Sequence, residues 1–314
     1  KQYGADILRL WVASSDYADD LRIGKEIINS TVDNYRKLRN SIRWLIGNLA
    51  HYKPEERVAY ADMPELERLI LSRLSQVGET VRAAYDTYDY KRIVAVLSNF
   101  MNIDLSAFYF DIRKDALYCD PISSTKRRAS LTVLDEVFET LTAWLAPILV
   151  FTMEEAWLER HPGTKESVHL RLFPDLPAEW RDTALEAKWE KIRAVRRVVT
   201  GALEIERKNK VIGSSLEAAP VVAVSDAELF EAVKDVDFAE ISITSFITLV
   251  KMEGPADAFR LDEQPGVAVV FEKASGKQCA RSRRFFADVG SDPTYPDLSA
   301  RDAQAMRERA AAGL

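Results

Sequence analysis

The stretch at residues 27–49, IINSTVDNYRKLRNSIRWLIGNL, decides the fold of this chain. Its apolar residues recur at steps of three and four, which is the period of an α-helix with one buried stripe. The stripe consists of Ile28, Val32, Tyr35, Leu38, Ile42, Leu45 and Leu49. Beside it lies a basic row of four cations and one asparagine, opposed only by Asp33: Arg36, Lys37, Arg39, Asn40 and Arg43. A charged row on a helix is most often a solvated face, so the neighbouring sequence has to distinguish a solvated face from a binding surface.

Further stretches with the same apolar period predict a helical bundle. They cover residues 64–85, 90–113 and 131–145, and the last pattern resumes at residues 150–157. Pro147 interrupts that pattern and is expected to break the helix, because proline lacks the N–H that a helix needs. A short helix is expected before the bundle, with Ala5, Leu8, Trp11 and Val12 on one side and with Asp6 and Arg9 paired. Long helices joined by short loops indicate an antiparallel bundle.

The sequence changes in character after the bundle. One more amphipathic helix is expected to run to about residue 208, and β-branched runs at 220–224, 247–252 and 267–271 predict strands, with a short helix at 226–233. The remainder is irregular and ends in an Ala/Arg-rich helix at 300–312. The predicted fold is therefore mostly α, with a small α/β unit and a tail. The predicted segments are a connector at 1–24, the bundle at 25–180, a junction helix with the α/β unit at 181–272, and a C-terminal module at 273–314.

Composition bounds the kind of protein. The 314 residues are 47% hydrophobic and 29% charged, which is typical of a globular chain. The net charge of −6 argues against a generally basic nucleic-acid binder but permits a local basic surface. Two cysteines cannot form a disulfide framework, so we expect a cytoplasmic protein. We find no signal peptide and no uninterrupted apolar run of membrane-spanning length, and predict no membrane partner. The sequence begins with Lys1 rather than methionine, so we expect a piece of a longer protein.

Sets of residues that carry out catalysis are not found. The three histidines, His51, His161 and His169, lie in no metalloprotease motif and near no cysteine or serine that would form a nucleophile pair. Glycine-rich phosphate-binding motifs are absent as well. Glu154 and Glu155 are adjacent on a helix and therefore point apart. An independent enzyme is a poor interpretation on these grounds.

A binding surface is better supported. Guanidinium groups bind phosphates in bidentate fashion and asparagine reads base edges, so the basic row at 36–43 suits RNA. Two further basic stretches occur at 188–210 and 275–284. Arg113 and Lys114 are interleaved with aromatic residues, the mixture that stacks on and neutralises RNA; these are Phe108, Tyr109, Phe110 and Tyr118. The alternative for these aromatic residues is core packing.

Four segments together resemble the C-terminal part of bacterial-type isoleucyl-tRNA synthetases, over essentially the whole chain. GADILRLWVAS at 4–14 is similar to the segment that follows the KMSKS loop of class I synthetases, and NYRKLRNSIRWLIGNL at 34–49 to the first helix of their anticodon-binding bundle. SAFYFDIRKDALYCD at 106–120 resembles the hallmark of the isoleucyl branch, and GALEIERKNKVIGSSLEA at 201–218 the junction after the bundle. The valyl and leucyl relatives share the bundle but match the second and third segments less well.

The resemblance implies recognition of the anticodon stem and loop of isoleucine tRNA. The complete enzyme would charge that tRNA with isoleucine, using ATP and Mg²⁺, and would act as a cytoplasmic monomer. Its catalytic and editing domains would precede Lys1, so the fragment is expected to be inactive and to need no cofactor. Leu10 and Trp11 would be left as exposed former interface. The predicted tRNA-binding residues are Arg36, Arg39, Asn40 and Arg43, then Arg113, Lys114, Arg207, Lys208 and Lys210, then Arg281, Arg283 and Arg284.

The tail departs from the family pattern. The family often ends in a zinc knuckle with C-x-x-C-W and a second C-x-x-C, but the corresponding positions here are Cys279, Ser282, Ser299 and Asp302, and Arg283 replaces the tryptophan. Structural zinc prefers four cysteine or histidine ligands. We therefore predict a degenerate zinc-finger-like tail without zinc.

Two other interpretations of the whole chain stay open at this point. One is the same region of a valyl- or leucyl-type class I synthetase. The other is a helical module whose basic faces bind an acidic protein. Weaker tRNA binding after replacement of Arg39 and Arg43 by alanine would favour tRNA recognition over the protein-binding module.

Overall fold

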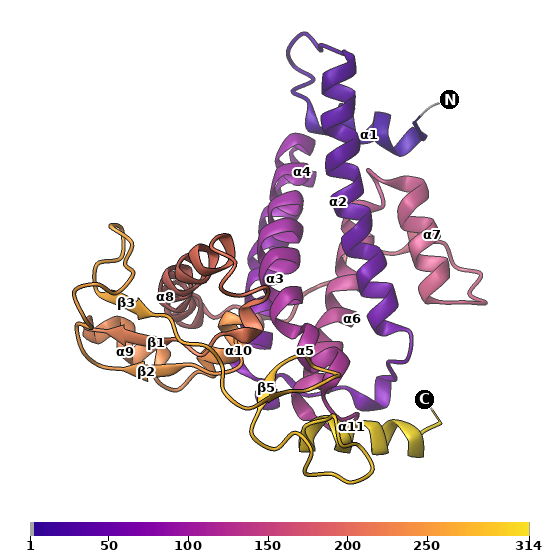
Figure 1. The fold of residues 1–314 in the computed structure, drawn as a ribbon. Helices are drawn as coiled ribbons and strands as arrows, with labels where there is room; N and C mark the ends of the chain where they lie inside the picture. The colour runs from indigo at the N-terminus through magenta and orange to yellow at the C-terminus, as the bar shows by residue number, and fades with distance from the viewer. Residues whose placement is uncertain (1–2, 314) are drawn as a thin grey trace. The chain divides into compact units, whose positions relative to one another are not determined.

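The computed structural model describes residues 3–313, which fall into two compact units (Figure 1). The first unit contains residues up to Arg113 together with Thr125–Asp182, and the second contains Lys114–Ser124 with Thr183 onward. The boundary after Asp182 lies close to the end of the bundle expected from sequence. The short segment 114–124, which sequence periodicity places inside the bundle, is grouped with the second unit instead.

The first unit is helical throughout its regular structure. Its α-helices are α1 (Ala5–Ser14), α2 (Lys25–Leu49), α3 (Glu65–Asp86), α4 (Tyr90–Asn99), α6 (Thr125–Leu145) and α7 (Val150–Arg160). A π-helical segment, η3 (Phe100–Phe110), continues α4 directly into α5 (Asp111–Cys119), and short 3₁₀ turns occupy Pro54–Glu56, Tyr60–Asp62, Val168–Leu170 and Ala178–Trp180. The expected break at Pro147 is confirmed, because α6 ends two residues before it and α7 begins three residues after it.

The core of this unit is made by the apolar stripes that the sequence shows. Trp144, Tyr109, Phe100 and Phe138 are among its largest fully buried side chains. Gly78 on α3 lets this helix approach α6 closely, since an added Cβ would lie 3.0 Å from the Trp144 ring. Burial of whole side chains from four helices therefore fixes the bundle.

The first helix differs from the expectation. Ile7 and Leu10 form its buried side, while Leu8 and Val12 are exposed. Asp6 and Arg9 do not pair with each other. The Asp6 carboxylate instead accepts hydrogen bonds from the backbone N–H groups of Phe151 (3.3 Å) and Thr152 (2.7 Å), and so caps the first turn of α7. Arg9 donates to the carbonyls of Pro147 (2.7 Å) and Ile148 (3.0 Å). The short helix is thus fastened to α7 by polar contacts, and Leu10 is not exposed.

A charged network lies inside the helical unit. Arg113 donates to both oxygens of Glu67, at 2.6 and 2.7 Å, and both side chains are nearly inaccessible to solvent. Glu67 also accepts hydrogen bonds from the hydroxyls of Tyr109 (3.0 Å) and Ser130 (3.1 Å). Burial, and next to it the Glu67 charge, raises the pKa of Tyr109 well above its usual value. The network joins α3, α6 and the continuous helix that includes η3 and α5.

The continuous helix Tyr90–Cys119 is long and apolar enough to span a membrane by length and composition alone, although 56% of its most apolar window is buried inside the protein. A central core helix of a globular protein passes the same test, and the burial of Phe100, Met101 and Leu105 identifies this helix as such a core element.

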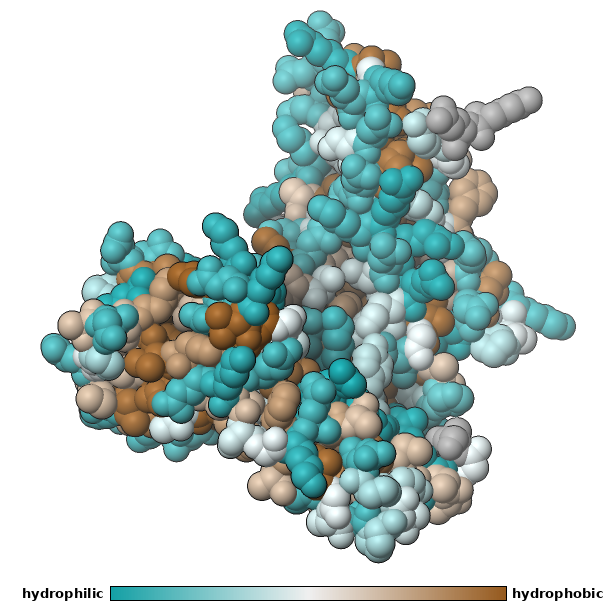
Figure 2. All heavy atoms as spheres, viewed as in Figure 1, coloured by the Kyte–Doolittle hydropathy of each residue, from teal (hydrophilic) through white to brown (hydrophobic). Residues whose placement is uncertain are grey.

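The second unit carries the sheet. It contains α8 (Thr183–Lys208), β1 (Val221–Val224), α9 (Ala227–Val233), α10 (Phe238–Ser242), β2 (Thr248–Val250), β3 (Val267–Val270), β4 (Lys277–Gln278), β5 (Phe285–Phe286) and α11 (Ala300–Ala311). The strand order is β2-β1-β3; β1 is parallel to β2 and antiparallel to β3, with Val222 opposite Val269. The predicted junction helix, the three strands, the short helix after β1 and the terminal helix are confirmed. Figure 2 shows apolar side chains gathered over this unit and hydrophilic ones over much of the helical unit.

Candidate nucleic-acid interface

The exposed face of α2 is the candidate interface. Leu38, Ile42 and Leu45 point into the core, which turns the basic row of the same helix outward. Arg36, Asn40 and Arg43 are exposed and follow one another at steps of four and three, so they lie on one face over about 10 Å at a rise of 1.5 Å per residue. This arrangement gives two guanidinium groups and one amide on a single strip.

The partners of these side chains are few. Arg36 lies 3.3 Å from Asp33 and Arg39 lies 3.6 Å from Glu155, and both pairs are largely exposed. Ion pairs of this kind contribute about 0–1 kcal/mol. Asn40 and Arg43 have no side-chain hydrogen bond or ion pair to any residue of the described range 3–313. The strip can therefore bind an anion without giving up a strong internal interaction.

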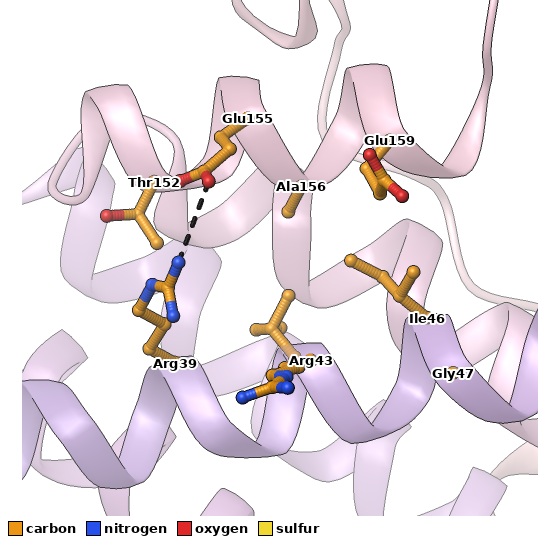
Figure 3. Close-up of a pocket in the computed structure, with 9 residues that line it drawn as sticks. Arg39, Arg43, Ile46, Gly47, Thr152, Glu155, Ala156 and Glu159 are labelled. Carbon is orange, nitrogen blue, oxygen red and sulfur yellow. Dashed lines mark ion pairs between the residues drawn. The ribbon is translucent and has the colours of Figure 1, made fainter.

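A groove of about 490 Å³ lies beside the strip, between α2 and α7 (Figure 3). Arg39, Arg43, Ile46 and Gly47 line it from α2, together with Ile42, and Thr152, Glu155, Ala156 and Glu159 line it from α7. Arg39 reaches across the groove to Glu155, whereas Arg43 turns outward from α2. The carboxylates of the α7 wall oppose a phosphate inside the groove. The exposed strip of Arg36, Asn40 and Arg43, of which only Arg43 lines the groove, is the part that suits a phosphate backbone. Sequence periodicity along α2 gave no signal for this acidic wall.

The second predicted basic and aromatic cluster is mostly buried. Arg113 is 2% exposed and is held by Glu67, so it is removed from the candidate RNA-binding residues. Phe108, Tyr109 and Phe110 are buried as well, and the Phe110 ring stacks on Trp44 at 4.1 Å. Core packing, the alternative for these aromatic residues, is the arrangement found. Tyr118 and Lys114 remain exposed, although Lys114 has a partner within the structure.

The junction after α8 keeps its cations at the surface. Arg207 pairs with Glu204 at 2.6 Å one turn earlier, while Lys208 and Lys210 are exposed. Lys210 adopts φ = 59°, in the left-handed region that favours glycine. Its N–H donates to the carbonyl of Arg207 and that of Val211 donates to Glu206, the two hydrogen bonds of a Schellman cap. This strained lysine ends the helix with its ammonium group outside.

The tail arginines differ in role. Arg283 is exposed, again with a positive φ of 63°. Arg281 is mostly buried and donates to the carbonyls of Tyr118 (2.5 Å) and Cys119 (2.9 Å). Arg284 donates to the carbonyl of Ser245 at 3.1 Å. Of this predicted group, Arg283 is therefore the side chain that faces solvent, and the other two hold the second unit together.

Comparison with known proteins gives a consistent result. Residues 67–223, half of the chain, match the family described as the anticodon-binding domain of tRNA ligase. The isoleucine--tRNA ligase of Agrobacterium fabrum is 61% identical over 311 residues, which are 99% of this chain and 32% of the ligase. The enzyme of the same name from Bradyrhizobium diazoefficiens is 59% identical over 314 residues, or 31% of its length.

A solved complex of LeuRS from Agrobacterium radiobacter K84 with tRNA and LeuAMS aligns with 58% of this chain and 20% of its own, at 15% identity and a TM-score of 0.44, which is too low to support an argument. The chain spans about a third of the length of the curated isoleucine--tRNA ligases that it matches. On the family match, the chain belongs to the anticodon-binding domains of tRNA ligases.

Proposed function

We propose that this chain, as a member of that family, binds the anticodon stem and loop of isoleucine tRNA within an isoleucine--tRNA ligase. The observation that carries the proposal is the strip of Arg36, Asn40 and Arg43, which is exposed on a helix that the core holds rigidly. Arginine binds phosphate in bidentate fashion, and asparagine both donates to and accepts from base edges. The identity of about 60% to isoleucine--tRNA ligases over the whole chain supports isoleucine as the cognate amino acid.

The RNA-binding residues are proposed in an order that burial supports. Arg36, Asn40 and Arg43 come first, and Arg39 joins them by exchanging its weak pair with Glu155 for a phosphate. Lys208 and Lys210 at the end of α8 come second, with Arg207 beside them, and Arg283 and Lys114 come third. Exposed cations of this kind bind the phosphate backbone mainly by counterion release, so they contribute affinity more than base discrimination.

The chemistry of the complete ligase is proposed to lie outside this chain. Activation of isoleucine with ATP and Mg²⁺, transfer to tRNA and editing would belong to the other two thirds of a protein such as the relatives. This fragment would then be inactive alone and would require no cofactor. A cytoplasmic location and a monomeric full-length enzyme belong to the same proposal.

The direct test is binding of the chain to isoleucine tRNA at two salt concentrations. The variant Arg39→Ala plus Arg43→Ala should bind more weakly and with a smaller slope of log K against log salt, by about 0.7–0.9 for each phosphate that is no longer neutralised. The matched control is Arg92→Ala plus Lys165→Ala, which removes the same charge from other exposed positions of the helical unit. Equal weakening in both variants would mean a general charge effect. Unchanged tRNA binding by the α2 variant would favour a module that binds an acidic protein.

Specificity requires a second comparison. A tRNA with one altered anticodon base should bind less tightly than the native tRNA at both salt concentrations if base readout resides in this chain. Equal, salt-sensitive binding of the two tRNAs would mean that the chain binds the phosphate backbone alone and that the remainder of the ligase supplies discrimination.

A further inference from the structure

The C-terminal module, described by the structure over residues 273–313, is built around one buried carboxylate. Asp302 is fully buried, and its Oδ2 lies 2.7 Å from the Ser299 hydroxyl and 3.1 Å from the Ser282 hydroxyl. Cys279, also fully buried, accepts a weak hydrogen bond at its Sγ from the N–H of Ser299, with 3.5 Å between nitrogen and sulfur. By the resemblance to isoleucyl-tRNA synthetases, these four positions correspond to the ligands of a zinc knuckle, and the structure brings them together in space although the residue types differ.

The residues present do not fit a zinc ion. Zinc sites use thiolate, imidazole or carboxylate ligands, and two of these four positions carry hydroxyls. The Oδ2 atom of the remaining carboxylate already accepts from both hydroxyls, and Arg301 (3.2 Å) and Arg281 (3.6 Å) place positive charge against Asp302, where a cation would be repelled. No group of three or more His, Cys, Asp or Glu side chains suited to a metal occurs within residues 3–313.

The second thiol of the unit, Cys119, is buried as well. Burial, followed by the charges of Asp115 and Asp302, raises the pKa of this thiol to about 12. The donor set at the four converging positions contains two hydroxyls and one carboxylate that already accepts from both of them, so it argues against a structural metal on chemical grounds.

The hydrogen bonds from Ser282 and Ser299 to Asp302 connect the same two elements, a hairpin turn and the start of a helix, that a metal would connect in a zinc knuckle. Ser282 lies in the turn between β4 and β5, where the N–H of Arg283 donates to the carbonyl of Cys279. Ser299 is the N-cap of α11, and Asp302 is three residues later in its first turn. The Asp302 carboxylate thus joins the β4–β5 turn to the N-terminus of α11. The helix dipole also favours a negative charge at that N-terminus.

A second layer of charges surrounds the carboxylate and holds another segment of the same unit. Arg301 contacts Asp302 and also both oxygens of Asp115, at 2.5 and 3.1 Å. Arg281, which lies near Asp302, donates to the last carbonyls of α5. Arginines and aspartates therefore alternate from α11 to segment 114–124, and the buried charge of Asp302 is compensated.

We propose that the C-terminal module is a metal-independent form of the zinc knuckle, in which the Asp302 carboxylate and the hydroxyls of Ser282 and Ser299 replace the metal as the cross-link. The module folds with no metal, and two of its arginines, Arg281 and Arg301, bind the carboxylates and carbonyls of segment 114–124. The proposal does not depend on tRNA binding.

The first test measures metal content and chelator sensitivity of the full chain. We expect far less than one zinc per chain after purification with added zinc, and a thermal midpoint that EDTA does not change. The variant Ser282→Cys plus Ser299→Cys plus Asp302→Cys restores four thiols at the converging positions. It should bind about one zinc per chain and lose thermal stability in EDTA. Stoichiometric zinc in the unaltered chain, with a midpoint lowered by EDTA, would overturn the proposal, as would a folded triple variant that binds no zinc.

A second measurement keeps the proposal testable if the triple variant does not fold. Asp302→Ala should raise amide hydrogen exchange at Cys279, Arg283 and Ser299 by about tenfold or more, because local opening of hairpin and helix becomes easier. The matched control is Asp288→Ala, since the Asp288 carboxylate accepts the N–H of Ala300 at the start of the same helix, at 3.1 Å, and no other hydrogen bond from residues 3–313. The control should alter exchange at the hairpin by less than about threefold. Equal protection of the hairpin in Asp302→Ala and in the unaltered chain would overturn the role of Asp302.

Discussion

The arginines of α2 and those of the C-terminal module differ in burial and in the number of their internal partners. On α2, Arg43 has no internal partner within residues 3–313, and Arg36 and Arg39 have weak exposed ones. In the C-terminal module, Arg281 and Arg301 are mostly buried among aspartates and backbone carbonyls. Both stretches are basic in sequence. The comparison teaches that an excess of cations in the sequence does not by itself distinguish an exposed basic surface from arginines that internal carboxylates and carbonyls bind.

The helical unit holds the most deeply buried of these internally paired arginines. Glu67→Ala leaves the Arg113 guanidinium buried without its counter-charge, so we expect a loss of about 3–5 kcal/mol in the free energy of unfolding, the largest effect among these predictions. Urea unfolding followed by circular dichroism measures it. The double variant Glu67→Met plus Arg113→Met removes both charges and should be destabilised much less than the single variant. A single-variant loss below about 1 kcal/mol would contradict the assignment of this pair to the core.

The same logic predicts a smaller loss in the C-terminal module. Arg301→Ala removes charged hydrogen bonds to Asp115 and leaves Asp302 less well compensated. Because Arg301 is still 28% exposed, we expect a loss of about 2 kcal/mol and a tRNA affinity changed less than about twofold. Thermal unfolding and tRNA titration give the two values. The control is Arg307→Ala, whose pair with Asp292 lies at the surface and should contribute below about 1 kcal/mol. A large decrease of tRNA affinity in Arg301→Ala would place this arginine with those of α2.

Sequence periodicity predicted most of the fold, since buried stripes of whole side chains determine the helices and β-branched runs determine the strands. It did not predict the orientation of α1, because the choice between Leu8 and Leu10 as the buried residue depends on how α1 packs against α7. The exposed cations of the candidate site were predicted on α2, at Lys208 and Lys210 after α8, and at Arg283. Arg113 could not be distinguished from a surface cation, because its partner Glu67 is distant from it in sequence. The same holds for Arg281, whose hydrogen-bond partners lie in segment 114–124.

Replacing the weakly paired or unpaired arginines of α2 should change tRNA affinity more than stability, the opposite of the result expected for Arg301. Arg39→Ala plus Arg43→Ala is expected to lower the affinity for isoleucine tRNA by about tenfold at moderate salt, because two phosphates are no longer neutralised. The free energy of unfolding should change by less than about 1 kcal/mol, since only the exposed pair with Glu155 is removed. Filter binding and urea unfolding measure the two effects. A marked destabilisation with unchanged tRNA affinity would mean that Arg39 and Arg43 stabilise the fold and do not bind tRNA.

The smallest effect is expected at the end of α8. There Lys210 has both a structural role, as the helix cap, and an exposed charge like those of α2. Lys210 caps the helix in a left-handed conformation that disfavours a side chain, yet presents its charge to solvent. Lys210→Gly should relieve the strain and raise the free energy of unfolding by about 0.5–1 kcal/mol. The same change removes one cation, so tRNA affinity should fall about two- to threefold with a slightly smaller salt slope. Lys208→Ala is the matched control, because it removes a neighbouring exposed charge from a helical position without strain. Equal or lower stability of Lys210→Gly would show that the cap gains nothing from glycine. A gain in stability with unchanged tRNA affinity would remove Lys210 from the proposed RNA-binding residues.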